Sequence, residues 1–443
     1  MEIERLVEQN QWWKDKSLIE EDYDIQKWKE KKYRWIPSLT KEIELKPFSL
    51  HILLGPRQAG KTTVMKLLIK QLLEKMDSKS LFYFSCETVG DYKELTDIIE
   101  SYLMFKDENS IDNSLIILDE ITSPKEWYRG VKALIDNGKL KKETVILTGS
   151  SSITIKKQVE LFPGRRGNGE DFILMPLSFR EFIKVIDPNL CEKIEPIKNF
   201  EEKELRKKAV KSLPYLKELN TLLSTYKNYG GFPLGIESIN DNKEDAKRVY
   251  LSWIKNAVLK AERSELIARQ IIKTILEKIP NPISWENISK QIEIKSPKTV
   301  SAYIELLKSI FVLDILYNID INKKTIKFGK NKKIHFIDPL LLELFEDWCL
   351  VKIKNKDNLL AESLTANILS RKFPERTFFW KNGFEIDAIA LDNKKIRGFE
   401  VKWSENPKLK KLPQFNSLVL ITKKDFSSNP LKIPLGIFLS IIE

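Results

Sequence analysis

The sequence contains few of the residues on which many enzymes depend. Among its 443 residues there are two histidines and three cysteines, and the cysteines lie far apart. So few histidines argue against a histidine-based nucleophilic triad and against a metal site built from histidine. The cysteine spacing fits neither a disulfide framework nor a zinc site. We therefore expect a protein of the reducing cytoplasm.

Long apolar runs are also missing. No uninterrupted apolar stretch approaches the roughly 20 residues that a membrane span needs, and the N-terminus is charged from its start, so we expect neither a membrane span nor a signal peptide. The length exceeds one hydrophobic core and predicts two to four domains. The formal net charge of +12 suits a polyanionic partner such as nucleic acid. A lysine-rich surface without any partner is an equally ordinary alternative.

The most informative stretch is LHILLGPRQAGKTTVMKLLIK, residues 50–70. A short apolar run ends at Gly55, and an amphipathic segment follows Gly60, Lys61 and Thr62, which fits the phosphate-binding pattern G-x-x-x-x-G-K-S/T at a strand-to-helix junction. Glycines let backbone N–H groups converge on one anion, and the helix N-terminus adds favourable partial charge. We predict that Lys61 reaches the β- and γ-phosphates of ATP and that Thr62 ligates Mg²⁺. The predicted nucleotide-binding residues are Gly55, Pro56, Arg57, Gln58, Ala59, Gly60, Lys61, Thr62 and Thr63.

A pair of carboxylates follows a second apolar run. Residues 115–118 read LIIL, and Asp119 and Glu120 come directly after them. A continuous apolar run is typical of a strand buried on both faces of a parallel sheet, where ligands bind at the carboxyl ends of the strands. We predict that Asp119 holds the Mg²⁺ shell and that Glu120 polarises the attacking water. An acidic turn after a buried strand is the simpler alternative.

Two polar segments come next. In TVILTGSSS, residues 144–152, we expect a hydroxyl group after the strand to sense the γ-phosphate or orient water. Helix capping by one of the serines is the simpler alternative, and both roles are compatible. In PGRRG, residues 163–167, Arg165 and Arg166 lie beside glycines in a predicted loop. An arginine on a loop can stabilise transition-state charge, although an unpaired surface arginine has the same appearance in the sequence.

Together these motifs resemble one archaeal and bacterial family of AAA-type ATPases over nearly the whole chain. The motifs, in order, are GPRQAGKTT, ILDEI followed by Trp127, ILTGSSS, PGRRG, MPLSFREF (175–182) and GGFP (230–233). The resemblance implies an ASCE-type parallel sheet in which the strand of Asp119 does not neighbour the phosphate-loop strand. It also implies Ser150 as the sensor and Arg165, directly after the loop glycine, as the arginine finger.

The fold class predicted is α/β, with five segments. Alternating strand-like and helical runs favour a parallel sheet covered by helices, with strands at 51–54, 80–86, 114–120, 144–150 and 171–178. The tryptophans near the N-terminus indicate a leader that packs through buried aromatic anchors, with nucleic-acid stacking as the alternative. The predicted segments are a leader (1–45), the P-loop ATPase core (46–185), a helical lid (186–265), a winged helix (266–332) and a PD-(D/E)xK nuclease-like domain (333–443).

The winged-helix prediction rests on residues 281–319. Ser284 can cap a short helix, and Ser296–Pro297 can start a second helix with Val300, Ile304 and Leu307 on one face. Lys298, Thr299 and Ser301 would begin an exposed recognition helix. The following lysines are expected at a hairpin tip on a DNA backbone or in a solvated loop, and they are Lys323, Lys324, Lys327, Lys330, Lys332 and Lys333.

The last segment carries a second candidate metal site. Residues 378–403 read as three antiparallel strands with turns at 382–383 and 392–393, and Glu400 and Lys402 lie two apart on one face. The segment resembles the PD-(D/E)xK nuclease core, in which Glu362, Asp387 and Glu400 would hold Mg²⁺ and Lys402 would assist catalysis. A sheet that carries a surface E-x-K pair is the alternative.

These observations predict a cytoplasmic, ATP-hydrolysing AAA-type protein that handles DNA through its backbone and structure rather than its sequence. The alternative is an ATP-regulated protein-binding switch or scaffold with an inactive nuclease-like domain. The sequence leaves assembly into a homo-oligomer open, and with it whether the arginine finger acts within one subunit or between two.

Overall fold

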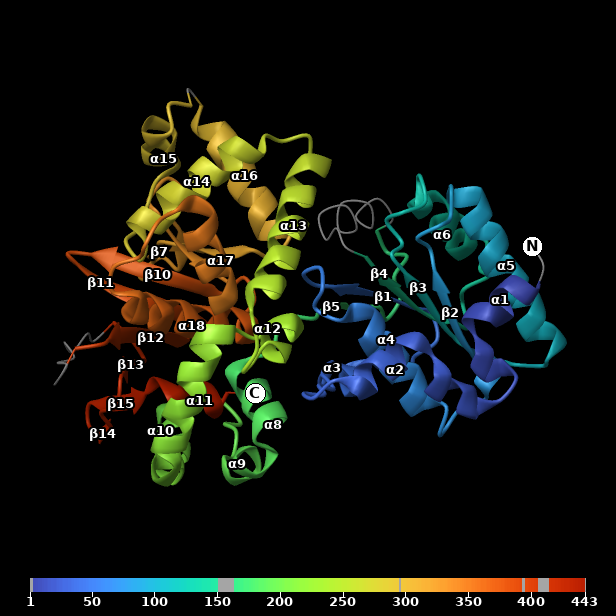
Figure 1. The fold of residues 1–443 in the computed structure, drawn as a ribbon, viewed down its shortest axis with the longest axis horizontal. Helices are drawn as coiled ribbons and strands as arrows, with labels where there is room; N and C mark the ends of the chain where they lie inside the picture. Colours follow the sequence, from blue (N-terminus) through green and yellow to red (C-terminus); the bar gives the residue numbers. More distant parts are fainter. Residues whose placement is uncertain (1–2, 150–162, 295, 393–394, 405–413, 443) are drawn as a thin grey trace. The chain divides into compact units, whose positions relative to one another are not determined.

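The computed structural model describes residues 3–149, 163–294, 296–392, 395–404 and 414–442. The chain divides into two compact units, Met1–Met175 and Pro176–Glu443 (Figure 1). Within the described ranges, no helix is both long and apolar enough to cross a membrane.

The first unit is built on a five-stranded parallel sheet. Its strand order is β2-β3-β4-β1-β5. The strand that ends at Asp119 is thus separated from the phosphate-loop strand by β4, as expected. The strands are β1 (Ser49–Leu54), β2 (Leu81–Ser85), β3 (Leu115–Asp119), β4 (Thr144–Thr148) and β5 (Asp171–Ile173).

The edge strand β5 is shorter than the sequence suggests. The prediction extended it to Ser178, but it ends at Ile173. Its partner strand β1 ends at Leu54, which is paired with Ile173, and beyond that point β5 has no neighbouring strand on which to continue the ladder. The apolar composition of the following residues therefore reflects burial in a loop rather than strand pairing.

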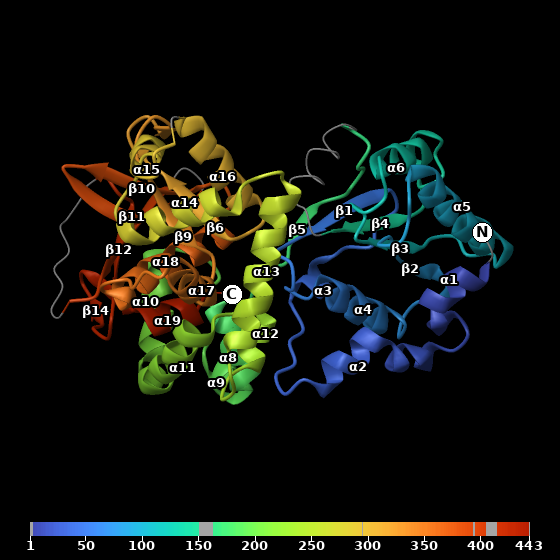
Figure 2. The same ribbon diagram turned by 45° about the horizontal axis from the view of Figure 1, so that its top comes forward.

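Helices cover both faces of this sheet (Figure 2). Helix α4 lies on one face, where α2 and α3 pack against it, and α5 and α6 lie together on the other face. This is the helix-covered arrangement expected from the alternation of strands and helices. The helices are α2 (Tyr23–Glu30), α3 (Leu39–Glu42), α4 (Lys61–Leu72), α5 (Tyr92–Glu108) and α6 (Trp127–Asp136).

The N-terminal residues after α1 (Ile3–Gln9) bind the open edge of β2. The amide side chain of Asn10 exchanges two hydrogen bonds with the backbone of Tyr83, of 2.9 and 2.7 Å. The indole N–H groups of Trp12 and Trp13 both donate to Leu81 O. These side chains satisfy backbone groups that an edge strand would otherwise expose. Trp12 and Trp13 are buried anchors, so they are not available for stacking on nucleic acid.

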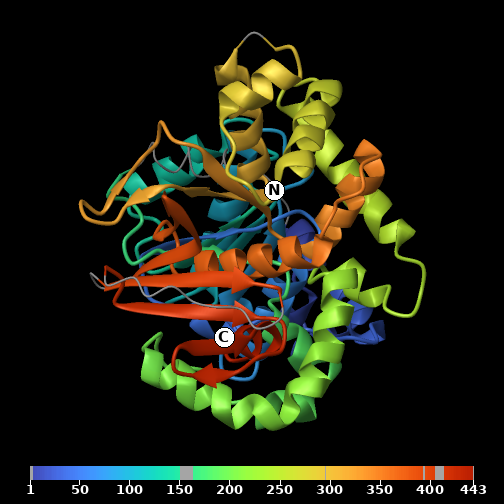
Figure 3. The same cartoon turned by 90° about the vertical axis from the view of Figure 1, so that its left-hand side faces the viewer.

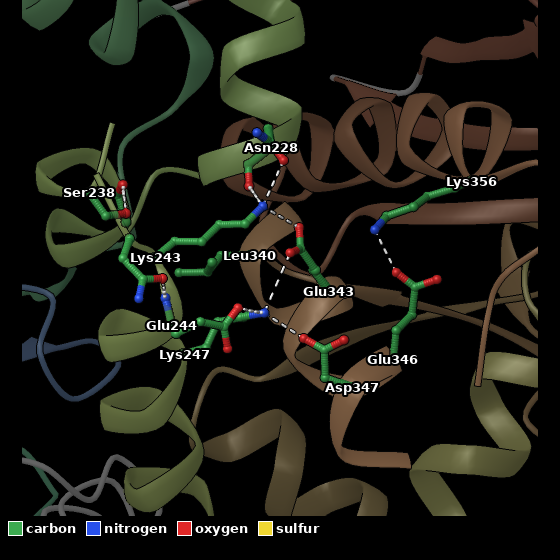
Figure 4. Close-up of polar contacts among 12 residues, drawn as sticks. Asn228, Ser238, Lys243, Glu244, Lys247, Leu340, Glu343, Glu346, Asp347 and Lys356 are labelled. Atoms are coloured by element: carbon green, nitrogen blue, oxygen red, sulfur yellow. Dashed lines mark hydrogen bonds and ion pairs between the residues drawn. The ribbon is translucent and has the colours of Figure 1, made fainter. Parts of the chain in front are cut away.

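The second unit begins with helices and, as predicted, residues 186–265 contain no strand. Helix α13 and the residue that precedes it, Lys243, are joined to the later helix α17 (Pro339–Cys349) by ion pairs (Figure 4). Lys243 bonds Glu343 at 2.8 Å, and Lys247 bonds Asp347 at 2.5 Å. The helices are α8 (Phe179–Ile186), α9 (Pro188–Lys193), α10 (Glu202–Ser212), α11 (Leu216–Tyr229), α12 (Pro233–Glu237) and α13 (Glu244–Lys260).

Three helices and two short antiparallel pairs follow. The Ser284 hydroxyl caps α15 by accepting a bond from Asn287 N at 3.1 Å. The predicted apolar face of α16 is buried, with Val300, Ile304 and Leu307 inaccessible to solvent. Strand β6 pairs with β9, and β7 pairs with β8 in a hairpin. The elements are α14 (Glu265–Lys278), α15 (Trp285–Gln291), α16 (Pro297–Ser309), β6 (Leu313–Tyr317), β7 (Ile319–Asp320), β8 (Thr325–Ile326) and β9 (Lys332–Phe336).

The C-terminal residues form a mixed six-stranded sheet with α18 (Lys356–Lys372) packed along it (Figure 3). The first three strands are antiparallel, as predicted, whereas β12, β13 and β15 run parallel, which the sequence did not indicate. Helix α19 (Leu435–Ser440) is the last helix of this unit in the described residues. The strands are β10 (Thr377–Asn382), β11 (Phe384–Asp392), β12 (Lys395–Lys402), β13 (Ser417–Thr422), β14 (Ser427–Ser428) and β15 (Leu431–Pro434).

Candidate functional site

The loop between β1 and α4 has the backbone shape that its glycines predict. Gly55, Gln58 and Gly60 all have positive φ angles, of 152°, 62° and 93°. A Cβ atom added at Gly55 would lie 2.3 Å from Leu174 O, so this position has no room for a side chain. Gly60 directly precedes Lys61, the first residue of α4. The loop thus brings backbone N–H groups to a helix N-terminus, which is the arrangement that binds phosphate.

Lys61 lies inside this loop. Its ammonium group donates to Gly55 O at 3.1 Å and to Pro56 O at 3.0 Å. Burial lowers the pKa of Lys61 to about 8, although the nearby carboxylates of Glu120 and Asp119 oppose that shift. The lysine is therefore held by weak neutral acceptors, and an entering phosphate would be a stronger partner for its charge.

Asp119 is the centre of the polar contacts at the carboxyl end of β3. Thr62 and Tyr83 donate from their hydroxyl groups to Asp119 Oδ2 at 2.6 and 3.0 Å. Thr148 Oγ1 and the backbone N–H of Glu120 donate to Asp119 Oδ1 at 2.9 and 3.0 Å. Both carboxylate oxygens are thus oriented from several elements. Thr62 and Asp119 form the oxygen pair that suits Mg²⁺ beside a bound nucleotide.

Glu120 follows Asp119 in a left-handed backbone conformation, with φ of 50°. A non-glycine residue in this region is uncommon, and such residues are enriched at functional sites. Its negative charge opposes the lowering of the Lys61 pKa by burial. The role of Glu120 toward the attacking water stays a prediction.

Sequence reasoning missed the residues behind Asp119. Lys66 lies on α4 with its ammonium 3.7 Å from the Tyr83 ring centre and 3.0 Å from Asp22 Oδ2. A chain of contacts therefore links Asp22, before α2, through Lys66 and Tyr83 to Asp119. Ser85 is in register with Asp119, and strand alternation puts Tyr83 on the same face as Ser85. Because that register is set by the pairing of β2 with β3, the sequence alone carried no signal for Tyr83.

The two loop arginines have different partners. Arg166 donates to Leu50 O at 3.2 Å and pairs with Asp171 at 2.6 Å, so it ties β1 to β5. Arg165 pairs with Asp136, and the two side chains are 35% and 42% exposed. Arg165 therefore has the less constrained side chain. The predicted sensor Ser150 lies outside the described residues.

The four predicted nuclease residues come together in the second unit. Glu362 projects from α18, Asp387 from β11, and Glu400 and Lys402 from β12. Asp387 accepts from Val401 N at 2.8 Å, and Lys402 pairs with Glu400 at 2.6 Å. Burial raises the pKa of the Glu362 and Glu400 carboxyls to about 7, and the Asp387 charge adds to both shifts, whereas Lys333 opposes the shift at Glu362 and Lys402 opposes it at Glu400.

An unpredicted residue occupies the middle of this cluster. The ammonium group of Lys333 lies 2.7 Å from Asp387 Oδ1 and 3.2 Å from Glu362 Oε2. The expectation that Lys332 and Lys333 lie at an exposed hairpin tip is wrong, because both are buried in β9. Lys332 packs over Trp285. The hairpin turn between β7 and β8 does expose Lys323 and Lys324, and Lys330 is exposed beyond it.

Searched across the described ranges, the structure contains no group of three or more histidine, cysteine, aspartate or glutamate residues arranged to hold a metal ion. All three predicted carboxylate ligands, Glu362, Asp387 and Glu400, lie within those ranges. As arranged, they do not fit the divalent cation that the nuclease resemblance implies.

Comparisons with known proteins agree with the fold of the first unit. Residues 48–183 match the family model described as "AAA domain". Together with the sheet order and the loop, this match supports an AAA-type P-loop ATPase domain. No curated protein matches the sequence.

Several solved structures show a partial likeness in fold. A Walker-type ATPase of Pyrococcus abyssi is 14% identical, with 67% of this chain and 91% of that chain covered and a TM-score of 0.37. The ORC2 protein of Aeropyrum pernix is 13% identical, with 68% and 88% covered and a TM-score of 0.37. The ORC1 protein of the same organism, in complex with DNA, is 15% identical, with 76% and 96% covered and a TM-score of 0.30.

Proposed function

We propose that the first unit binds ATP with Mg²⁺ and hydrolyses it. The observation that carries this proposal is the bond between Thr62 and Asp119, 2.6 Å long, beside a buried Lys61 at the start of α4. Residues 55–63 would hold the phosphates through backbone N–H groups and the Lys61 ammonium. Mg²⁺ would supply charge neutralisation at the phosphate oxygens, held by Thr62 and Asp119.

The remaining residues divide the chemical work. Glu120 would accept a proton from, or orient, the attacking water, because it is the carboxylate directly beyond Asp119. Arg165 would leave its exposed pair with Asp136 to stabilise transition-state charge. Ser150 remains the proposed sensor of the γ-phosphate. Nothing in these roles requires a covalent intermediate.

We propose DNA as the partner of the second unit. Residues 266–332 have the helix, turn, helix and hairpin order of a winged helix, and the β7–β8 turn exposes Lys323 and Lys324. Lysines at a hairpin tip would contact phosphates without reading bases, which agrees with the net charge of +12. Residues 186–265 remain the proposed lid, and the cytoplasm remains the proposed location, with all three cysteines free and buried.

A second candidate function is favoured by the C-terminal cluster. Residues 333–443 combine α18 with a mixed sheet, which supports the proposed nuclease-like fold, but Lys333 lies among the carboxylates that a metal would need. This arrangement favours the alternative of an ATP-regulated, protein-binding switch or scaffold in which the nuclease-like domain cuts nothing. ATP would then regulate binding rather than strand cleavage.

The deciding experiment measures ATP hydrolysis by the full chain with and without duplex, single-stranded and branched DNA. If ATP hydrolysis is coupled to DNA, at least one form of DNA should speed up ATP turnover. This stimulation should be lost when Lys323, Lys324 and Lys330 are replaced by alanine. Basal turnover should stay unchanged in this variant, because every residue of the proposed nucleotide site belongs to the first unit and the three lysines belong to the second. An ATP turnover rate that no form of DNA changes, together with protein complexes that form only with nucleotide, would favour the regulatory switch.

A further inference from the structure

The ammonium group of Lys333 lies among three carboxylates. It lies 2.7 Å from Asp387 Oδ1, 2.7 Å from Glu385 Oε1 and 3.2 Å from Glu362 Oε2. A lysine ammonium has three N–H donors and no acceptor, so these three oxygens match its full bonding capacity. The side chain is only 1% exposed. The three carboxylates thus form a cation-binding site, and the cation that occupies it is the ammonium group of Lys333.

We propose that Lys333 is the resident cation of this acidic cluster, so that the wild-type domain holds its carboxylates together without any divalent metal. The proposal concerns the second unit alone and does not depend on ATP hydrolysis. We refer to Glu362, Glu385 and Asp387 as the carboxylate cage, whose charges are balanced by the Lys333 ammonium in place of a metal ion. The proposal also explains why residues that resemble a nuclease site lie together without forming a metal site.

The other oxygens of the cage are also occupied. Asp387 Oδ2 accepts from Val401 N at 2.8 Å, and Glu362 Oε1 accepts from Asn358 at 3.0 Å. Glu385 Oε2 pairs with Lys381 at 2.9 Å. A divalent cation would have to displace one of these partners as well as Lys333. The cage is therefore satisfied as it stands, as buried charges must be.

Glu400 is the partial exception. Its Oε1 pairs with Lys402 at 2.6 Å, while its buried Oε2 has no hydrogen-bond partner. Burial and the Asp387 charge raise the pKa of the Glu400 carboxyl, whereas the Lys402 and Lys333 charges oppose that shift. The cation beside Glu400 is the Lys402 ammonium.

Lys333 is fixed in place by its strand. β9 pairs with β6, where Leu316 lies opposite Lys333, and the neighbouring residue Lys332 exchanges backbone hydrogen bonds with Ile283 of 2.8 and 2.9 Å. Burial alone would lower the pKa of Lys333, but Asp387, Glu362 and Glu385 raise it above its usual value. The ammonium is thus both charged and held at the centre of the cage. It excludes Mg²⁺ or Mn²⁺ by charge and by position.

The test is Mn²⁺ binding to the full chain without nucleotide, followed by electron paramagnetic resonance. Wild type and Glu400→Gln should bind Mn²⁺ identically, because no Mn²⁺ enters the cage. Lys333→Ala should gain one Mn²⁺ site that wild type lacks, and Lys333→Ala combined with Asp387→Asn should lose it. Lys332→Ala is the matched control, since it removes the same charge from the adjacent position of β9, and it should gain no site.

Two results would overturn the proposal. One is a Mn²⁺ site in wild type that disappears in Glu400→Gln or Asp387→Asn, because the cage would then accept metal with Lys333 present. The other is a folded Lys333→Ala variant, verified by circular dichroism, that gains no site. If Lys333→Ala does not fold, the comparison of wild type with Asp387→Asn still tests the proposal, since a Mn²⁺ site that is lost in Asp387→Asn would show that metal enters the cage with Lys333 present.

Discussion

Thr62 donates a hydrogen bond of 2.6 Å to Asp119, although the two residues are 57 positions apart. Thr62 lies in the first turn of α4 and Asp119 ends β3. Strand β4 lies between the strands that lead to them. Thr148, at the end of β4, bonds the other oxygen of Asp119 at 2.9 Å. The carboxylate is thus oriented from both sides before any ligand arrives. This preorganisation is what a Mg²⁺-nucleotide site needs, because little has to rearrange on binding.

Tyr83 should act as a positioning residue for Asp119. Tyr83→Phe removes the hydroxyl that donates to Asp119 Oδ2 at 3.0 Å. A hydrogen bond to a charged group contributes about 1.5 kcal/mol, so we expect kcat to fall roughly tenfold and the Mg²⁺ requirement to rise, with ATP affinity little changed. Tyr102→Phe is the control, because that buried hydroxyl bonds Lys79 O instead. Equal effects of the two variants on kcat would show that the effect comes from packing alone.

ATP binding should take up protons near pH 8. The pKa of Lys61 is lowered by burial to about 8 in the free protein, and phosphate contact raises it again. Around pH 8, binding is therefore accompanied by uptake of up to about half a proton, and affinity weakens as the pH rises further. Calorimetry in buffers of different ionisation enthalpy measures this uptake.

Lys61→Arg provides the matched control for that measurement. An arginine stays protonated at every pH used, so its variant should show no proton uptake from this group even if binding is weaker. Equal uptake by wild type and Lys61→Arg would mean that another group titrates.

Substitutions of Arg165 and Arg166 should have different effects on ATP hydrolysis. Arg165→Ala should slow hydrolysis on the order of 10³-fold with nearly unchanged ATP binding, since a finger acts mainly in the transition state. Arg166→Ala should instead lower thermal stability, because Arg166 joins β1 to β5 through Leu50 O and Asp171.

Mixing experiments extend the same comparison. If the finger comes from a neighbouring subunit, Arg165→Ala mixed with Lys61→Ala should regain part of the activity. A kinetic defect confined to Arg166→Ala would assign the finger to the other arginine.

DNA affinity should depend steeply on salt. Replacing Lys323, Lys324 and Lys330 by alanine should flatten the slope of log affinity against log salt by up to about 0.9 for each DNA phosphate that is no longer neutralised. Lys332→Ala should leave the slope unchanged, because that side chain is buried against Trp285. If the triple variant keeps the wild-type slope, the DNA surface lies elsewhere.

Local pattern was enough to predict much of the fold. The continuous apolar run before Asp119 predicted a strand buried on both faces, and Ser284 predicted the start of α15. The order of the sheet came from the family resemblance. The length of β5 was overestimated because a buried loop can have the same apolar composition as a strand. The strand ends where its partner β1 ends, at Leu54.

The candidate sites were predicted as sets of motif residues, but their supporting partners were not. Lys66, Asp22 and Tyr83 meet only after three separate segments have packed together. Lys333 looked like one more lysine of a basic hairpin, yet it is 54 residues from Asp387, its partner in the acidic cluster. The sequence gives the charge of Lys333, whereas the face of β9 on which its side chain lies depends on the register of β9 with β6.

The most direct test of the central claim measures ATP binding and hydrolysis by wild type, Lys61→Ala and Glu120→Gln. The proposed site predicts that Lys61→Ala loses nucleotide binding, whereas Glu120→Gln binds ATP normally and hydrolyses it on the order of 10²-fold more slowly or worse. Circular dichroism verifies that both variants are folded. Hydrolysis at the wild-type rate by either folded variant would contradict the assignment of the nucleotide site to the loop before α4 and the carboxyl end of β3.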